Sequence, residues 1–375
     1  MSKNHPAQPV KIPTIIFFIF TITTFCFAQA AKPDPIRIGV ASLTHGHAGD
    51  VFERFAKGDV EIVGIYEENQ GLVKYYAEQY NLNKKLFFTD LDEMLDKVSP
   101  EAVTAYGSIY EHLSVVESCA PRGIHVMVEK PLAFDLDHAL AMQKLAKKHN
   151  IHIFTNYATT WFPSVHAAYD LVHNQQQIGE IRKVVVHDGH KGPKEIGCGA
   201  AFLEWLTDPV QNGGGAIVDF GCYGVNLMTW LMKGARPLTV TAVTQQIKPD
   251  VYPHVDDEAT IILTYEKAQC IIQASWNWPF DRKDMDIYGQ TGYVFAPTGR
   301  TLIVRQKARE PVKTQTLEPR AYPYDNPFSS LTAVLRGQIE LDETDLSSLE
   351  INVTVAKILD AARTSARTGK TVTLQ

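Results

Sequence analysis

Three side chains from distant parts of the chain, Lys130, Asp219 and Tyr223, have the chemical types that the oxidation of an alcohol requires. This reaction needs a base that takes the hydroxyl proton while the carbon-bound hydrogen leaves as hydride to a nicotinamide ring. Tyr223 is a candidate base, because an ammonium from Lys130 would stabilise its phenolate and lower its pKa. Asp219 would orient the lysine and a neighbouring hydroxyl. The same three residues could also form a structural polar cluster.

A second group of residues follows the first predicted strand, where a turn into a helix could hold a pyrophosphate. Such a turn needs small residues, so that backbone N–H groups and a helix N-terminus can approach the phosphates. Only Gly39 fits the G-x-G-x-x-G spacing, and Ala41 and Thr44 occupy the other two glycine positions. Ser42 and Leu43 lie between them. An ordinary strand-to-helix turn is the alternative interpretation.

The second predicted strand leads into Glu67, which supports the phosphate interpretation. In dinucleotide-binding domains an acidic residue about 20 residues after the glycine-rich turn bonds the ribose hydroxyls. A carboxylate at this position would also repel a 2′-phosphate, which favours NAD over NADP. The alternative is a solvated loop carboxylate.

The segments that must position these residues alternate short apolar runs with amphipathic stretches, which is typical of a parallel sheet covered by helices. We therefore predict an α/β protein that begins with a doubly wound nucleotide-binding domain. Its predicted strands are Ile36–Ala41, Val60–Tyr66, Ala102–Tyr106, His125–Val128 and Ile151–Thr155. Its predicted helices include Gln70–Tyr80, Leu91–Lys97, His112–Pro121 and Asp137–His149.

After Asn156 the chain becomes rich in strands, which predicts a second α/β domain with an open, mainly antiparallel sheet. The predicted strands are Lys183–His187, Leu238–Gln246, Ala259–Tyr265, Cys270–Trp278, Met285–Tyr288 and Leu302–Arg305. The expected division is residues 31–155 for the first domain and residues 156–375 for the second.

Two segments resemble a known family. Gly123–Ala133 carries Glu-Lys-Pro at the end of a strand, and Asn212–Tyr223 contains three consecutive glycines followed by an aspartate. With these motifs the chain resembles the Gfo/Idh/MocA family, which includes glucose-fructose oxidoreductase and inositol dehydrogenase, from about Ile36 to its C-terminus. The resemblance implies an NAD(P)-binding Rossmann domain, then a substrate-binding domain with an open sheet, and hydride chemistry on a sugar, polyol or related alcohol. It also implies a homo-oligomer that assembles through that sheet.

The resemblance assigns roles to individual residues. Glu129 and Lys130 match the family's Glu-Lys-Pro motif, whose lysine lies beside the nicotinamide and the substrate hydroxyl. Asp219 matches the aspartate that faces the substrate, and Tyr223 stands where many members carry histidine. His112 lies close to where relatives line the nicotinamide pocket, although a plain helix-start residue is equally consistent with its position.

Departures from the family pattern bear on the substrate site. Thr159 and Thr160 occupy positions where many relatives carry arginine, so we expect a less cationic subsite. Trp161 could offer a flat apolar face to a sugar ring. His190 leaves the first strand of the second domain and could reach into the cleft.

The remaining histidines and tryptophans have simpler expected roles. His45-x-His47 and His187-x-x-His190 are histidine pairs, but neither belongs to an H-E-x-x-H motif or a Cys/His quartet, so no metal site is predicted. For Trp276 and Trp278 we expect packing in the core or in a subunit interface.

Composition limits the classes of partner. The 375 residues contain 36 Lys and Arg against 42 Asp and Glu, a formal charge of −6. The absence of a basic tract argues against nucleic acid and leaves a small molecule as the expected ligand. Five cysteines without a C-x-x-C pair exclude a zinc ribbon or a disulfide-dense scaffold. Whether any of the cysteines pair is not readable from the sequence.

The first thirty residues read as a secretory signal peptide. An apolar run from Ile15 to Ala28 follows Lys3 and Lys11, and the small-residue pattern Ala28-Gln29-Ala30 closes it. The run is shorter than the roughly 20 residues of a spanning helix. We therefore expect an exported, periplasmic protein without a membrane anchor after cleavage; an uncleaved anchor is the alternative.

Export requires a tightly held cofactor, since free NAD is scarce outside the cytoplasm. We therefore expect an NAD(P)-dependent oxidoreductase that acts on a sugar, polyol or glycoside and retains its nicotinamide cofactor. A redox-neutral, NAD-dependent glycosidase-like enzyme is one alternative. A non-catalytic saccharide-binding member of the fold is another, because Ala41 and Thr44 replace glycines of the phosphate turn.

Overall fold

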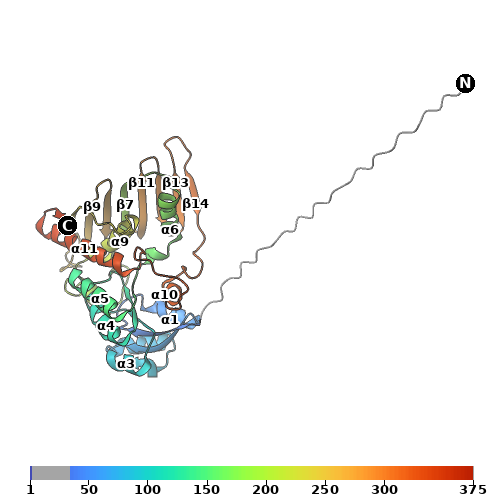
Figure 1. Ribbon diagram of the computed structural model, residues 1–375. Coiled ribbons are helices and arrows are strands. Elements are labelled where there is room, and N and C mark those ends of the chain that lie inside the picture. The colour runs from blue at the N-terminus through green and yellow to red at the C-terminus, as the bar shows by residue number, and fades with distance from the viewer. Residues whose placement is uncertain (2–33, 375) are drawn as a thin grey trace. The chain divides into compact units, whose positions relative to one another are not determined.

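Two sheets organise the part of the chain that the computed structural model describes, Met1 and residues 34–374 (Figure 1). Apart from Met1, the predicted signal peptide lies outside the described residues. Between residues 34 and 374, no helix combines the length and the apolarity that crossing a membrane would require. Residues 34–374 belong to one compact unit, in which both sheets contribute to the same site.

The first sheet is parallel throughout, with strand order β3-β2-β1-β4-β5-β6. The order reverses between β1 and β4, which is where doubly wound sheets bind their ligands, outside the carboxyl ends of the strands. The predicted doubly wound parallel sheet is confirmed. The strands are β1 Ile36–Ala41, β2 Val60–Tyr66, β3 Phe87–Phe88, β4 Ala102–Ala105, β5 His125–Glu129 and β6 Ile153–Asn156.

Local capping signals set the ends of the helices that cover this sheet. The side chain of Asp90 accepts a hydrogen bond from the Glu93 N–H at 2.7 Å, which starts α3, and Asn150 ends α5 in a left-handed conformation. The helix α1 and the two-residue strand β3 were not among the predicted elements. The helices are α1 Ala48–Ala56, α2 Gln70–Gln79, α3 Leu91–Val98, α4 His112–Cys119 and α5 Leu136–His149.

The second sheet has nine strands in the order β14-β13-β12-β11-β7-β10-β9-β8-β15. Only β7 and β10 run parallel as neighbours, and the other neighbouring pairs are antiparallel, which confirms the predicted open, mainly antiparallel sheet. The strands β12, β14 and β15 were not among the predicted elements. The strands are β7 Ile181–Gly189, β8 Thr239–Gln245, β9 Glu258–Thr264, β10 Gln269–Ser275, β11 Arg282–Gly289, β12 Tyr293–Thr298, β13 Thr301–Arg305, β14 Lys313–Thr316 and β15 Val372–Thr373.

Helices cover one face of the second sheet and leave the other face open. Buried and partly exposed residues alternate along β9 and β10, because one face packs against α8 and α9 while the other does not. Every residue of α9 is buried. The helices of this part are α6 Pro163–Tyr169, α7 Ala200–Leu206, α8 Ala216–Asp219, α9 Gly221–Leu231, α10 Pro327–Leu335 and α11 Leu349–Thr368.

One segment that the expected division placed in the second domain returns to the first sheet. Phe328, Leu331 and Val334 of α10 pack in the same core cluster as Ile36 and Ile38 of β1. Figure 1 shows α10 beside α1. The division at residue 156 therefore needs this correction, since the first core is completed by residues from near the C-terminus. Cys119, Cys198, Cys222 and Cys270 are free thiols.

Candidate active site

A cleft of about 640 Å³ lies at the carboxyl ends of β1, β2 and β4. Its volume is within the range of pockets that hold cofactors and other small molecules. The walls come from both parts of the chain, because α4 and the turn after β1 face residues on and after α7. The lining includes Ala41, Ser42, Thr44, Glu67, Ser108, Glu111, His112, Glu204, Trp205, Asp208 and Gln211.

The turn after β1 presents backbone N–H groups as the sequence predicted. Ser42 has a φ of 64°, a conformation that residues other than glycine rarely adopt. Glu67 secures the turn by accepting a hydrogen bond from the Leu43 N–H at 2.7 Å. Within residues 34–374, the N–H groups of Thr44 and Gly46 have no acceptor, and α1 begins directly after them. This arrangement suits a phosphate.

Glu67 is the buried carboxylate of the cleft. Its second oxygen accepts from the Asn69 N–H at 2.8 Å, and burial raises the pKa of its carboxyl. The lining of the cleft contains neither lysine nor arginine. Four further acidic residues line it: Glu68, Glu111, Glu204 and Asp208. The cleft is therefore strongly acidic, which disfavours any additional phosphate on a bound nucleotide.

His112 contributes an unused hydrogen-bond acceptor. Its Nδ1 lies 3.1 Å from the carbonyl oxygen of Leu132, so Nδ1 donates and Nε2 is left as the acceptor. Nε2 is buried, and no partner for it exists in the described part of the chain. Burial lowers the pKa of His112 to about 4, so the ring is neutral. Nε2 can therefore accept a hydrogen bond from an N–H or O–H group of a bound ligand. The carboxamide N–H groups and the ribose O–H groups of a nicotinamide dinucleotide are such donors.

Lys130 and Asp219 form a buried pair, as the sequence predicted. The Lys130 ammonium donates to the backbone carbonyl of Asp219 at 2.9 Å and also to its carboxylate Oδ1. The indole N–H of Trp276 donates to the other carboxylate oxygen at 2.9 Å. Burial opposes charge here, but Lys130 and the Trp276 hydrogen bond outweigh it and lower the pKa of Asp219. Trp276 is thus more than the core residue that we expected.

Tyr223 lies in the site, but its surroundings do not favour the predicted phenolate. Burial raises the pKa of Tyr223 well above its usual value. The Lys130 nitrogen stands 5.3 Å from the centre of the Tyr223 ring and bonds to Asp219 instead of the hydroxyl. Its role as the base stays a prediction; in this structure the Tyr223 ring faces the ammonium of Lys130.

A second lysine and aspartate, which the sequence analysis missed as a pair, face the same ring. Lys283 donates to Asp188 Oδ1 at 2.6 Å, and its nitrogen lies 3.8 Å from the centre of the Tyr223 ring. Burial raises the pKa of Asp188 to about 7. The inward position of Lys283 could have been predicted from the alternation of buried and exposed positions along β11. This alternation places Lys283 on the same face as the buried Met285 and Ile287.

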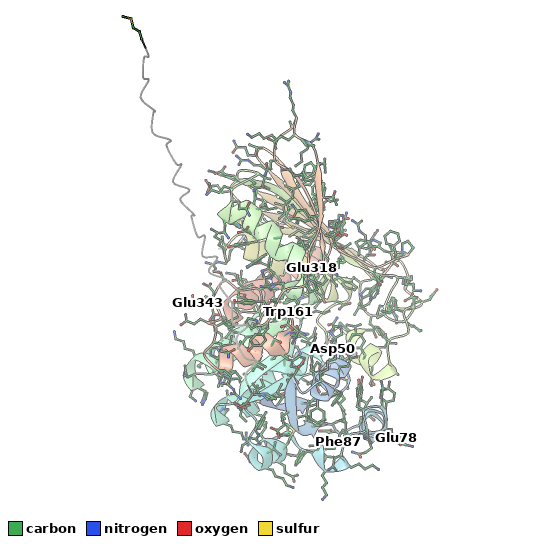
Figure 2. The ribbon with its side chains drawn as sticks, turned by 90° about the vertical axis from the view of Figure 1, so that its right-hand side faces the viewer. Asp50, Glu78, Phe87, Trp161, Glu318 and Glu343 are labelled. Carbon is green, nitrogen blue, oxygen red and sulfur yellow. The ribbon has the colours of Figure 1, made fainter. Side chains whose placement is uncertain are left out.

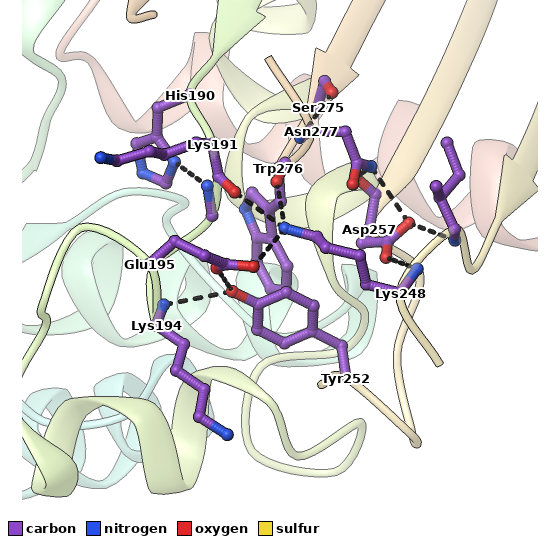
Figure 3. A network of polar contacts seen from close by, with 12 residues as sticks. His190, Lys191, Lys194, Glu195, Lys248, Tyr252, Asp257, Ser275, Trp276 and Asn277 are labelled. Carbon is purple, nitrogen blue, oxygen red and sulfur yellow. Dashed lines mark hydrogen bonds and ion pairs between the residues drawn. The ribbon is translucent and has the colours of Figure 1, made fainter. Parts of the chain in front are cut away.

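His190 reaches the site from the end of β7, as expected. Its ring meets that of Phe220 edge-on at 4.8 Å, and its Nδ1 accepts from the Gly192 N–H at 2.9 Å. Figure 3 shows the network that holds this loop: Lys248 donates to the carbonyls of Lys191 and Trp276, each at 2.7 Å. The same lysine therefore fixes both the His190 loop and the tryptophan that bonds Asp219.

Glu129 and Trp161 belong to a separate chain of hydrogen bonds. Glu129 accepts from Asn156 at 2.9 Å and pairs with His47 Nδ1 at 3.1 Å. Trp161 donates to Asn156 Oδ1 at 3.1 Å, so it belongs to this chain of hydrogen bonds. Figure 2 shows Trp161 between the two parts of the molecule.

His45, His47 and Glu129 also place possible metal-ligating atoms within 4.8 Å of one another, a grouping that the sequence analysis had set aside. His47 and Glu129 pair with each other. The third, His45, uses its Nδ1 to accept from the His47 N–H at 3.0 Å, and burial lowers its pKa well below the usual value. These contacts form a hydrogen-bonded support for the end of β5.

Comparison with known proteins agrees with this site. Residues 37–157 match the model of an oxidoreductase family with an NAD-binding Rossmann fold, and residues 166–295 match the model of the GFO/IDH/MocA C-terminal domain. The chain belongs to the Gfo/Idh/MocA family of NAD(P)-dependent oxidoreductases. Its first domain is an NAD-binding domain, and the cleft, the turn after β1 and His112 are the parts that would hold the cofactor.

Individual relatives are distant. Trans-1,2-dihydrobenzene-1,2-diol dehydrogenase from Xenopus tropicalis is 24% identical over 81% of this chain and 89% of that protein. The aldose-aldose oxidoreductase of Caulobacter crescentus has a TM-score of 0.75 at 21% identity, over 91% of this chain and 100% of that one. An inositol dehydrogenase homologue from Azotobacter vinelandii, solved with NAD+, has a TM-score of 0.78 at 17% identity, over 92% and 98%. These structures share the fold.

Proposed function

We propose that the protein oxidises a hydroxyl group of a carbohydrate or polyol with a retained NAD. The observation that carries this proposal is the buried Lys130–Asp219 pair, which lies at the carboxyl end of β5, beside the cofactor cleft. An ammonium held in this way can bind a hydroxyl oxygen and stabilise the negative charge that develops on it. The relatives named above support a polyhydroxylated substrate.

The residues of the site divide the work between them. When bound, NAD supplies the acceptor for the hydride. Lys130 binds the reacting hydroxyl, and Asp219 orients the lysine. Trp276 holds Asp219 from behind, and the site excludes water, since the side chains of Lys130 and Asp219 are each only 8% exposed. Low exposure strengthens each of these electrostatic contacts.

The preference for NAD over NADP is part of the proposal. Glu67 and Glu68 follow β2, where the ribose of a dinucleotide lies in doubly wound domains. With no cationic side chain in the lining, every charged side chain that a 2′-phosphate could meet there is a carboxylate. We expect NADP to bind at least about tenfold more weakly than NAD, a difference of roughly 1.4 kcal/mol.

The test has two steps. Residues 31–375 are purified and denatured, and any released nucleotide is identified by mass spectrometry. The purified protein is then given NAD+ or NADP+ with D-glucose or myo-inositol, and absorbance of the reduced cofactor is followed, with Lys130→Met as the inactive control. Release of NAD(H), or NAD+ reduction that Lys130→Met abolishes, supports the proposal. A protein that releases no nucleotide and binds neither dinucleotide contradicts it.

Two further properties remain proposals. We propose a homo-oligomer that forms through the open face of the second sheet, where Val185, Ile271 and Ile262 lie in one partly exposed cross-strand row. Light scattering after size-exclusion chromatography tests it, since Ile271→Lys should yield monomers. We also propose export directed by residues 1–30, which cell fractionation of a host that expresses the full chain tests.

A further inference from the structure

We propose that the proton of the reacting hydroxyl is taken up by the Lys283–Asp188 pair, with Lys283 in contact with the substrate and Asp188 as the final acceptor. The proposal rests on the oxidoreductase function proposed above and names the base that this function requires. It gives Lys283 the role for which the sequence had suggested Tyr223.

The position of Lys283 allows it to reach the same substrate as Lys130. Both ammonium nitrogens lie within 5.3 Å of the centre of the Tyr223 ring, so the two pairs pack around the same side chain. The Lys283 side chain is 28% exposed, whereas Asp188 behind it is 1% exposed. A ligand can therefore touch Lys283 but has to exchange a proton with Asp188 through it.

Asp188 has the free capacity that a proton acceptor needs. Its Oδ1 accepts from Lys283, and its Oδ2 is buried without a partner among residues 34–374. A fully buried carboxylate oxygen that lacks a hydrogen bond is costly, and protonation relieves that cost. Burial accordingly raises the pKa of Asp188 to about 7, a value suited to exchanging protons near neutrality.

The other groups around Asp188 are poorer acceptors. Those that face it are Lys283 from β11, Lys130 after β5, Asp219 from α8, and Cys222 and Tyr223 from α9. Asp219 already has both carboxylate oxygens bonded. Burial raises the pKa of Cys222 to about 12 and that of Tyr223 well above its usual value, so both stay protonated.

A cross-strand ion pair without a catalytic role is the simplest alternative. Lys283 and Asp188 are direct partners in the β11–β7 register, so strand pairing alone explains why they meet. It does not explain why a carboxylate on the covered face keeps one oxygen unpaired. Nor does it explain why the lysine lies against Tyr223, the ring that the Lys130 ammonium also faces.

The step balances as follows. The carbinol C–H bond breaks, and its electron pair leaves with the hydrogen as hydride to the oxidised nicotinamide. The O–H bond breaks, and its electrons form the carbonyl double bond. The hydroxyl proton joins Lys283 Nζ as one proton of that ammonium passes to Asp188. The net change in the protein is one carboxylate converted to a carboxylic acid, which then loses its proton to solvent.

The experiment measures the pH profile of NAD+ reduction by the full chain, with D-glucose and myo-inositol as probes. Wild-type kcat/KM should rise with pH through about 7, because Asp188 must be deprotonated to act. Asp188→Asn should remove this limb and lower kcat/KM about 100-fold on its alkaline side. Lys283→Arg should also remove the limb and lower kcat/KM, since a guanidinium does not release its protons. Substrate affinity should be kept, because the positive charge remains. Asp284→Asn, which removes a carboxylate on the opposite face of β11, should leave the profile unchanged.

A second readout needs no turnover. Infrared titration of the holoenzyme should show two buried carboxylic acid signals, because burial raises the pKa of Asp256 to about 6 and that of Asp188 to about 7. The signal that disappears at the higher pH should be present in wild type and in Asp284→Asn and absent in Asp188→Asn, while Asp256→Asn should remove only the other. An active wild type whose pH limb survives in Asp188→Asn would overturn this proposal alone. A wild type that reduces NAD+ with neither probe would count against the proposed function, and the infrared titration would still decide whether Asp188 takes up a proton near neutrality.

Discussion

The two lysine–aspartate pairs beside Tyr223 use the same residue types and reach opposite states. Asp219 accepts from Lys130 and from Trp276, and these contacts lower its pKa despite burial. Within residues 34–374, the Asp188 carboxylate accepts only from Lys283, and burial raises its pKa to about 7. At similar burial, the cations and donors around a carboxylate therefore decide whether it stays charged or exchanges protons: Lys130, His190 and the Trp276 N–H together lower the pKa of Asp219.

The largest expected effect comes from replacing Lys130, the lysine of the pair in which both carboxylate oxygens are bonded. Lys130→Met should lower kcat by about 10³-fold or more, because the hydroxyl loses its cation and Asp219 is left as an unpaired buried charge. NAD affinity should change little, since Lys130 does not line the cleft. Steady-state kinetics and NAD titration check both parts. Lys130→Met with normal turnover would mean that the reacting hydroxyl lies elsewhere.

The pH dependence of stability should separate the two aspartates. The folded-state pKa of Asp188 is raised above its unfolded value near 4, so its carboxyl destabilises the fold increasingly as pH rises from about 4 to about 7. Asp188→Asn removes this loss, and its stability relative to wild type should improve by roughly 4 kcal/mol across that window.

Asp219 should behave in the opposite way. Its folded-state pKa is lowered, so it contributes stability above its unfolded pKa, and this contribution is lost as pH falls through the folded value. Asp219→Asn should therefore cost most above about pH 4. Thermal unfolding of both variants over a pH series measures the contrast, and parallel curves for the two would refute it.

A smaller effect should follow from making the Lys130–Asp219 pair resemble the Lys283–Asp188 pair. Trp276→Phe removes the indole N–H from Asp219 and leaves that carboxylate with a free buried oxygen, as Asp188 has. We expect a loss of about tenfold in kcat and a raised pKa for Asp219. Trp278→Phe is the matched control, because its ring lies near His187 and Arg282. Equal losses in both variants would point to packing alone.

The smallest effect concerns Glu67, a buried carboxylate held by neutral backbone N–H groups instead of a lysine. Glu67→Gln keeps the shape but weakens the contacts to the turn and to a ribose. We expect NAD to bind about threefold to tenfold more weakly, with kcat unchanged. Glu78→Gln serves as the control, because Glu78 is exposed on α2 and does not line the cleft, and isothermal titration with NAD+ gives both constants. A large fall in kcat would show that Glu67 acts beyond binding.

Much of this architecture was predictable because it depends on local patterns. The boundaries of β1 and β2 followed from apolar runs, and the Glu-Lys-Pro motif marked the carboxyl end of β5. Lys130 and Asp219 were predicted as partners from the resemblance, and they meet. These predictions needed only the periodicity of the chain and a short motif.

The features that escaped prediction depend on long-range packing. Lys283 follows Asp281 and Arg282, so this segment reads as polar in the sequence. The alternation along β11 puts Lys283 on the covered face, but only the register of β11 against β7 makes Asp188 its partner. The sequence did not show how deeply Tyr223 is buried, because burial, which raises its pKa, is a property of the packed core. The role of Trp276 likewise depends on its meeting Asp219, which lies in another segment of the chain.

The return of α10 to the first core has a consequence for how the protein is made. Phe328, Leu331 and Val334 cover β1, yet the ribosome adds them after all the strands of the first sheet and most of the second have been synthesised. Until then, Ile36 and Ile38 lack part of their apolar cover. A nascent chain must therefore keep its earliest strand protected while the second sheet forms, and a fragment that ends before Pro327 would expose an apolar groove in place of a finished nucleotide-binding domain.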